Sequence, residues 1–352
     1  MPDHLARALS TGDCRWGRGQ RPAAGTRQAR SGWCAAALLL LLGSAAGVEP
    51  VPAELGAAAA VRFFALGDVP YAEPEYEQLT RLLAEANRRQ PPFILHVGDI
   101  KAGNAPCTEA AFARIASLFR DQPVPVVYTP GDNEWTDCRR AAAGGYEPLE
   151  RLQVLRRLFF ADPLVLRMTA LQPVQPDPDY PENAYFIHGG VMFTLVHVVG
   201  SNKHRRPAEA AAMAEFQRRS AANRALLREA AAAARARGAS AMLVICHANP
   251  MLERAAPPAG FLPLHEDLHE LLRQFDGPLL LIHGDTHQFR FDQPLHDPHT
   301  GAPVTRLWRL EVPGFPFVAG VWVEVATDAP VPFRVTRQNP RALGQLEALR
   351  GN

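Results

Sequence analysis

The chain has 352 residues, of which 47% are hydrophobic and 21% charged, a composition typical of a soluble globular protein with a sizeable core. The net charge is only +1, and the first 47 residues carry six Arg against two Asp, so the rest of the chain is net negative. Because a nucleic-acid-binding surface needs a basic excess, we predict no stable nucleic-acid partner.

The N-terminus has the pattern of a targeting segment. Five arginines between residues 15 and 30 precede an apolar run at 35–42, and small residues at 44–46 follow as a cleavage site. The apolar run is shorter than the roughly 20 residues that span a bilayer, although a short membrane anchor is an alternative. We predict a signal peptide at 1–46, a linker at 47–60, and export to the periplasm or medium with no integral membrane span after cleavage.

The next hundred residues alternate between apolar strands and helical periodicity. Strands are predicted at 61–66, 93–97 and 124–128, and helices at 75–89, 109–120 and 148–160. This β-α-β-α-β order is typical of a parallel sheet.

The second half is also mixed. The patterns predict a proline-rich irregular loop at 171–183, a hairpin of 185–188 with 191–199, and a long Ala-rich amphipathic helix at 208–237. They then predict a strand at 241–246, a helix at 264–275, a strand at 279–282 and an antiparallel tail at 305–335. No repeat or linker divides residues 61–340, which we interpret as one domain. No feature of the sequence indicates an oligomeric state.

Six potential metal ligands come directly after apolar strands. Four are aspartates that each follow a glycine, and two are histidines: Asp68, Asp99, Asp132, Asp285, His247 and His287. One Gly-Asp pair is usually a turn or a helix cap, but the carboxyl ends of strands share one rim, where ligands bind. The joint pattern predicts a hydrolytic di-metal site.

Five motifs in order carry a resemblance to a known family. They are Leu66-Gly-Asp-Val-Pro70, His96-Val-Gly-Asp-Ile-Lys101, Pro130-Gly-Asp-Asn-Glu134, Ile245-Cys-His247 and His283-Gly-Asp-Thr-His287. The series resembles the calcineurin-like metallophosphoesterases over residues 61–291. The resemblance implies an α/β fold, a four-layer αββα sandwich, and hydrolysis of phosphate mono- or diesters by a metal-bound hydroxide at a di-metal site.

The resemblance also implies roles for individual residues. Asp68 and His287 would bind the first of two divalent ions, and Asp99 would bridge both. The second ion would be bound by Asp132, His247 and Asp285.

The chain departs from the family pattern at several positions. Pro70 stands where the first motif has a histidine, which leaves Tyr71 or a water for that coordination place. Asp132 replaces an asparagine, and Asp285 replaces a histidine. Because the ligand set is rich in oxygen, Mn²⁺, Mg²⁺ or Ca²⁺ is favoured, with Zn²⁺ or Fe still open.

Asn133 stands where the family has the histidine that stabilises the phosphoryl group. We assign it a catalytic role beside Asp99, as a hydrogen-bond donor to phosphate. Lys101, Asn104 and His204 are further candidates for contributing charge, and Glu134 for a supporting role behind the ligands.

Two alternative functions stay open. Loss of the motif histidines is compatible with a catalytically degenerate protein that binds a metal or ligand on the same fold. His265-Glu266-x-x-His269 matches the zinc-protease pattern, although its apolar stripe is also typical of an ordinary helix. His96 and His283 lie within strands and are interpreted as core residues.

Three cysteines follow the targeting segment. Cys107 and Cys138 each come shortly after a Gly-Asp strand end, so we predict a disulfide between them that braces the rim. Cys246 ends an apolar strand and is predicted to be a buried free thiol.

Overall fold

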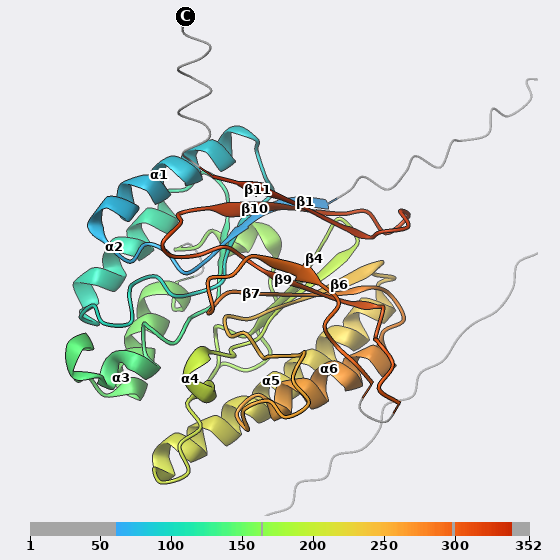
Figure 1. Ribbon diagram of the computed structural model, residues 1–352. Helices are drawn as coiled ribbons and strands as arrows, with labels where there is room; N and C mark the ends of the chain where they lie inside the picture. The colour runs from blue at the N-terminus through green and yellow to red at the C-terminus, as the bar shows by residue number, and fades with distance from the viewer. Residues whose placement is uncertain (1–60, 163–164, 298–299, 340–352) are drawn as a thin grey trace, which may run out of the picture. The chain divides into compact units, whose positions relative to one another are not determined.

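The computed structural model describes residues 61–162, 165–297 and 300–339, so the predicted signal peptide and linker lie outside the described residues. Within that part of the chain, the strands form two sheets. The first has the order β11-β10-β1-β2-β3 and the second β4-β5-β6-β7-β9-β8. Figure 1 shows the sheets between two groups of helices.

In the first sheet, the three N-terminal strands are parallel, as the β-α-β-α-β pattern predicts. They are β1 (Val61–Leu66), β2 (Ile94–His96) and β3 (Val126–Tyr128). The C-terminal strands β10 (Gly320–Val325) and β11 (Phe333–Gln338) extend this sheet in antiparallel fashion beside β1.

The second sheet begins with the predicted hairpin of β4 (Ala184–His188) and β5 (Val191–Leu195). It continues in parallel through β6 (Ala241–Ile245), β7 (Leu279–His283) and β9 (Leu307–Glu311), and ends with β8 (Arg290–Asp292).

The predicted antiparallel tail is therefore wrong in one strand. β9 pairs in parallel with β7, while β10 and β11 join the other sheet. The sequences of β9 and β10 look alike because both strands are largely apolar, and the periodicity of a sequence does not tell which sheet a strand joins.

The two sheets pack face to face through large apolar side chains. Phe63 of β1 makes an edge contact with Phe193 of β5, with ring centroids 5.4 Å apart, and Phe93 contacts both. Leu243 and Leu280 of the second sheet belong to the same buried cluster. Both faces of these strands are buried, which explains why their sequences are continuous apolar runs.

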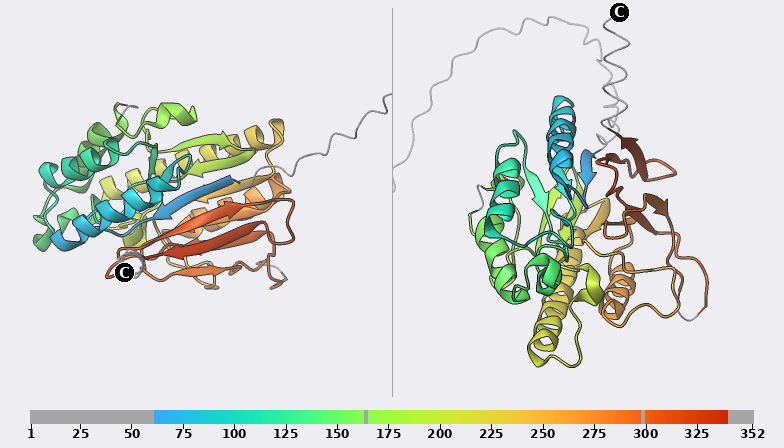
Figure 2. Two further views of the ribbon diagram at one scale, coloured as in Figure 1. Left: turned by 90° about the horizontal axis from the view of Figure 1, so that it is seen from above. Right: turned by 60° about the vertical axis from the view of Figure 1, so that its left-hand side comes forward.

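Helices cover the outer faces of both sheets (Figures 1 and 2). α1 (Glu73–Arg88) and α2 (Glu109–Arg120) cover the first sheet, with α3 (Pro148–Leu155) beside them. α5 (Ala210–Ala236) and α6 (Leu262–Gln274) cover the second sheet. The four-layer αββα arrangement is thus confirmed.

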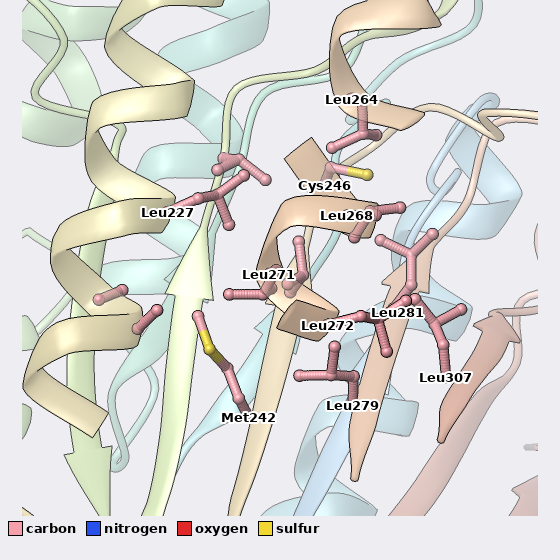
Figure 3. Close-up of a cluster of buried hydrophobic side chains, with 14 of the residues drawn as sticks. Leu227, Met242, Cys246, Leu264, Leu268, Leu271, Leu272, Leu279, Leu281 and Leu307 are labelled. Atoms are coloured by element: carbon pink, nitrogen blue, oxygen red, sulfur yellow. The ribbon is translucent and has the colours of Figure 1, made fainter. Parts of the chain in front are cut away.

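The leucine stripe of α6 shows how a helix is fixed to its sheet. Leu264, Leu268, Leu271 and Leu272 are buried in one cluster with residues of β6, β7 and β9, as Figure 3 shows. Burying each such side chain contributes about 1.5–3 kcal/mol. The free thiol of Cys246 lies in the same cluster, as predicted.

The loops after β2 and β3 are joined by the predicted disulfide. Cys107 and Cys138 are bonded, with their Cα atoms 5.7 Å apart. Among the described residues, no helix is long and apolar enough to cross a membrane.

Candidate metal centre

The six predicted ligands come from five strands whose carboxyl ends meet at one rim. Asp68, Asp99 and Asp132 follow β1, β2 and β3, whereas His247 follows β6, and Asp285 and His287 follow β7. Because the strands concerned run in parallel within each sheet, the turns after them gather at the same edge.

The backbone at these turns is unusual. Asp68, Asp99, Asp285 and His287 all have left-handed conformations, with φ between 54° and 77°. Such conformations are uncommon outside glycine and concentrate at functional sites. Their clustering at one rim is an independent sign that this edge has a function.

The preceding glycines allow close packing. A Cβ atom on Gly131 would lie 2.1 Å from Asp99 Oδ1, and one on Gly284 would lie 2.3 Å from Asp68 Oδ2. No side chain fits at either distance. The Gly-Asp pairs therefore bring backbone from one loop against the carboxylate of another.

The ligands form two groups that share one residue. In the first group, the ligand atoms of Asp68, Asp99 and His287 lie within 4.8 Å of one another, and in the second group the same holds for Asp99, Asp132 and His247. The shared residue is Asp99, which was predicted to bridge two ions.

His247 lies at the centre of the second group. Its Nε2 atom is 3.1 Å from Asp132 Oδ1, 3.4 Å from Asp99 Oδ1 and 3.9 Å from Asp285 Oδ1. Its Nδ1 atom is 2.8 Å from the carbonyl oxygen of Val97, to which it donates a hydrogen bond. This bond fixes the ring so that Nε2 faces the carboxylates.

Burial makes this concentration of carboxylates unfavourable without a cation. Burial raises the pKa of Asp68 to about 8 and that of Asp285 to about 7, and it raises the pKa of Asp99 well above its usual value. The pKa of His247 would be lowered by burial, but the surrounding carboxylates raise it well above its ordinary value. Burial acts to raise the pKa of Asp132, but its hydrogen bond and charge interaction with His247 lower it.

The donor set fits divalent cations. Asp68 Oδ2 is buried and has no hydrogen-bond partner among the described residues, and such an orphaned carboxylate oxygen is costly unless a cation binds it. Carboxylate oxygens with two imidazole nitrogens are suitable ligands for Mn²⁺, Mg²⁺, Fe or Zn²⁺.

Tyr71 reaches the ligands from the loop of the first motif. Its hydroxyl donates to Asp99 Oδ2 at 3.0 Å and lies 3.1 Å from His287 Nε2. Burial, followed by the charge of Asp99, raises the pKa of the Tyr71 hydroxyl. Of the two alternatives for the coordination place of the missing first-motif histidine, a tyrosine and a water, the tyrosine lies within reach of the ligands.

Asn133 is held rigidly at the edge of the first group. Its amide Nδ2 donates to the Tyr71 hydroxyl at 3.2 Å, and its backbone N–H donates to Asp99 Oδ1 at 3.0 Å. Its carbonyl oxygen accepts a hydrogen bond of 2.6 Å from Lys101 and lies close to the disulfide sulfurs. The disulfide thus supports Asn133, the residue predicted to contact phosphate.

Glu134 ties the two aspartate turns together from behind. Its Oε1 atom accepts hydrogen bonds from the backbone N–H groups of Asp99 at 3.1 Å and Gly131 at 2.7 Å, and from the hydroxyl of Tyr128 at 2.8 Å. This is the supporting position that the sequence suggested for it.

Three supporting residues were missed by the sequence analysis. The Ser201 hydroxyl donates to Asp132 Oδ2 at 2.9 Å, and the Asn249 N–H donates to Asp285 Oδ2 at 3.0 Å. Glu311 of β9 accepts from the Gln288 N–H at 3.0 Å and fixes the loop of Asp285. The Gly-Ser pair at 200–201, which follows an apolar run, was a signal of the same kind as the Gly-Asp pairs.

The remaining candidates lie outside the ligand groups. Lys101 donates to the carbonyl oxygens of Ala102 and Asn133, and His204 is buried beside Glu215. Asn104 is exposed on the loop after β2. His96 and His283 are fully buried in their strands, as predicted.

The His-Glu-x-x-His pattern does not assemble a metal site in the part of the chain that the structure describes. His265 Nε2 is 2.7 Å from the Pro250 carbonyl oxygen, to which it donates, and Glu266 pairs with Arg224. Neither histidine of this pattern belongs to a group of three potential ligands among the described residues.

Comparisons with known proteins agree with the motif order. The family model of the calcineurin-like phosphoesterases matches residues 61–289. No curated protein sequence gives a significant match.

Similar solved structures have low sequence identity. A dimetal phosphatase from Danio rerio is 13% identical over 78% of this chain and 98% of its own, with a TM-score of 0.45. A purple acid phosphatase from yellow lupin seeds is 13% identical over 80% and 52%, with a TM-score of 0.49. An anchor protein of the Plasmodium inner membrane complex is 11% identical over 80% and 89%, with a TM-score of 0.42.

Proposed function

This chain belongs to the calcineurin-like phosphoesterase family, and we propose that it is a metal-dependent hydrolase of phosphate mono- or diesters. The observation that carries the proposal is the convergence of two ligand groups on the shared carboxylate of Asp99. A structural turn has no need for such an arrangement of buried like charges, which is unfavourable without cations.

The residues divide between two cation positions. Asp68, Asp99, His287 and the Tyr71 hydroxyl would hold one ion, and the second would be held by Asp99 with Asp132, His247 and Asp285. Two divalent cations, when bound, would activate a water molecule and neutralise charge on the phosphoryl oxygens.

Asn133 would orient the phosphoryl group. Its side-chain amide donates to the Tyr71 hydroxyl, and its backbone is held by Asp99 and Lys101, so the second amide N–H can donate to a phosphoryl oxygen with little reorganisation. An amide does not release a proton at neutral pH, so Asn133 does not protonate the leaving group. We therefore expect the rate to fall steeply as the leaving group becomes more basic.

A direct test uses protein stripped of metal with a chelator. Hydrolysis of an aryl phosphate monoester and diester is measured after adding Mn²⁺, Mg²⁺, Ca²⁺, Fe²⁺ or Zn²⁺, with Asp99→Asn as the inactive control. We expect turnover that requires a metal. Turnover that is equal in Asp99→Asn would contradict the proposed site.

The second candidate is a degenerate protein that binds metal without turnover. It is favoured by Asn133, because the family's histidine is missing at the position beside the phosphoryl group. The same experiment separates the two, since metal binding without hydrolysis of any ester would support the second candidate.

We also propose that the protein is exported. The Cys107–Cys138 disulfide is of the kind that persists in oxidising compartments, and the targeting pattern at 1–46 agrees with it. N-terminal sequencing of the mature protein should begin at Gly47. A mature chain that retains the arginine-rich segment would contradict cleavage.

A further inference from the structure

The connection between β9 and β10 carries two exposed phenylalanines. Phe315 is 42% exposed and Phe317 is 56% exposed, whereas Val318 and Ala319 beside them are buried. Single exposed apolar residues are common on protein surfaces. Two aromatic rings in one tight turn, closed by a 3.0 Å hydrogen bond from Phe317 N–H to the Gly314 carbonyl, are a more specific feature.

This turn is attached directly to the candidate metal centre. The Phe315 N–H donates to the carbonyl oxygen of Asp68 at 3.2 Å. A Cβ atom on Gly314 would lie 2.5 Å from Asp68 Cβ, so the turn packs against the side chain of this ligand. The backbone of the turn that carries the two phenylalanines is therefore held beside the site.

The rings form a series that leads from the surface to the ligands. The Phe315 ring stacks on Tyr71, with centroids 5.3 Å apart and an interplanar angle of 20°. It also makes an edge contact with His287 at 6.2 Å. The Tyr71 hydroxyl reaches Asp99, so the organic part of a molecule whose phosphate contacted the ligands would come close to the Phe315 ring.

The chemistry of the turn selects among occupants. Two side chains offer far less than the roughly 800 Å² per partner of a stable protein interface. Aromatic faces held in fixed positions are suited to stacking on planar rings, and such stacking tolerates many ring types.

We propose that Phe315 and Phe317 form an aromatic platform that binds the planar ring of the substrate, so that the enzyme prefers phosphate esters of ring-bearing alcohols, such as nucleotides. This inference rests on the proposed hydrolase function for its kinetic test. The binding of the ring itself can be measured without turnover.

The kinetic test compares AMP with ribose 5-phosphate. Both esters release a primary 5-hydroxyl of a ribose unit, so the leaving oxygens are closely similar and the base is the main difference. We expect kcat/KM to be at least about tenfold higher for AMP, mainly through KM, which corresponds to 1.4 kcal/mol. Phe317→Ala and Phe317→Leu should remove this preference, and Phe317→Trp should keep it.

Val331→Ala is the matched control, because Val331 is also exposed (46%) but lies in the turn at the other end of β10. The Val331→Ala variant should prefer AMP over ribose 5-phosphate as strongly as the wild type does. Equal kcat/KM for the two esters in the wild type, or a preference that survives Phe317→Ala, would overturn the platform.

A second measurement does not depend on catalysis. Saturation-transfer NMR with adenosine and metal-free protein should show contact with the adenine protons, which Phe317→Ala weakens and Val331→Ala does not. Absence of contact would overturn the platform even if esters are hydrolysed. Binding of adenosine without hydrolysis of any ester would support the platform and would contradict only the hydrolase function.

Discussion

Two of the regions in which the molecule buries charge are built in opposite ways. At the candidate metal centre, three aspartates lie within 3.9 Å of one buried histidine, and burial raises the pKa of the neighbouring Asp68 to about 8. Beneath α5, Arg219 donates to both oxygens of Glu215 and to the carbonyl oxygens of His197 and Lys203.

In this second region, every carboxylate has its own cation. Glu182 accepts hydrogen bonds from Arg156 at 3.0 and 2.7 Å and from His197 at 2.7 Å. Burial acts to raise the pKa of Glu182, but these contacts lower it to about 2. Burial likewise acts to raise the pKa of Glu215, but Arg219 and His204 lower it.

The difference distinguishes a structural network from a site. A buried carboxylate whose charge is balanced within the protein needs no external cation, and loss of its partner is strongly destabilising, whereas an excess of buried carboxylates requires an external cation. The pKa directions of the two regions express this balance, and the following changes test it.

The largest effect is expected at the shared ligand. Asp99→Asn removes one negative charge from the excess of buried carboxylates and weakens the ligand that the two groups share. We therefore expect kcat to fall at least about 1,000-fold. Because the change relieves repulsion, the free energy of unfolding of metal-free protein, measured in urea, should stay equal or rise. A marked loss of stability would mean that Asp99 belongs to a structural network and not to a metal site.

In the network around Glu215 and Glu182, the change in the free energy of unfolding should have the opposite sign. Arg219→Met leaves Glu215 buried without its cation, so the free energy of unfolding should fall by about 3–5 kcal/mol. Arg81→Met is the control, since its ion pair with Glu77 is exposed and should be worth less than about 1 kcal/mol. Equal effects of the two changes would contradict the distinction.

Acid should weaken the same network. The pKa of Glu182 is lower in the folded protein than its usual 4.5, so its contribution is fully present above that pH and is lost as pH falls toward 2. The contribution is about 3 kcal/mol. The stability difference between wild type and Glu182→Gln should shrink over this range in urea titrations, and a constant difference would refute the assignment.

A smaller effect is expected at Tyr71. Tyr71→Phe removes the hydroxyl that lies between Asp99 and His287, so metal affinity measured by calorimetry should fall about tenfold. Tyr76→Phe is the control, because Tyr76 lies in α1 and its ring packs against Arg114 of α2. If the metal affinity of Tyr71→Phe is unchanged, the tyrosine is not a ligand, and a water is left for the coordination place of the missing first-motif histidine.

Much of this architecture could be predicted from the sequence, because strand ends are marked locally. A Gly-Asp pair after an apolar run signals both the turn and a polar group at the rim, which is how Asp68, Asp99 and Asp132 were found. The disulfide between Cys107 and Cys138 followed from the same logic of adjacent loops.

The rest depended on contacts that the local pattern does not contain. α5 has the composition of an ordinary surface helix, and charged residues in helices are usually solvated, so burial of Arg219 was not foreseen. The supporting roles of Ser201 and Glu311 depend on loops and on the sheet to which β9 belongs. Pairing between distant strands decides those contacts.

The most direct test of the central claim counts bound metal. Equilibrium dialysis of chelated protein against Mn²⁺ or Zn²⁺, followed by elemental analysis, should give two ions per chain in the wild type and at most one in Asp99→Asn. A wild-type chain that binds no ion, or an Asp99→Asn chain that still binds two, would contradict a di-metal centre built around Asp99.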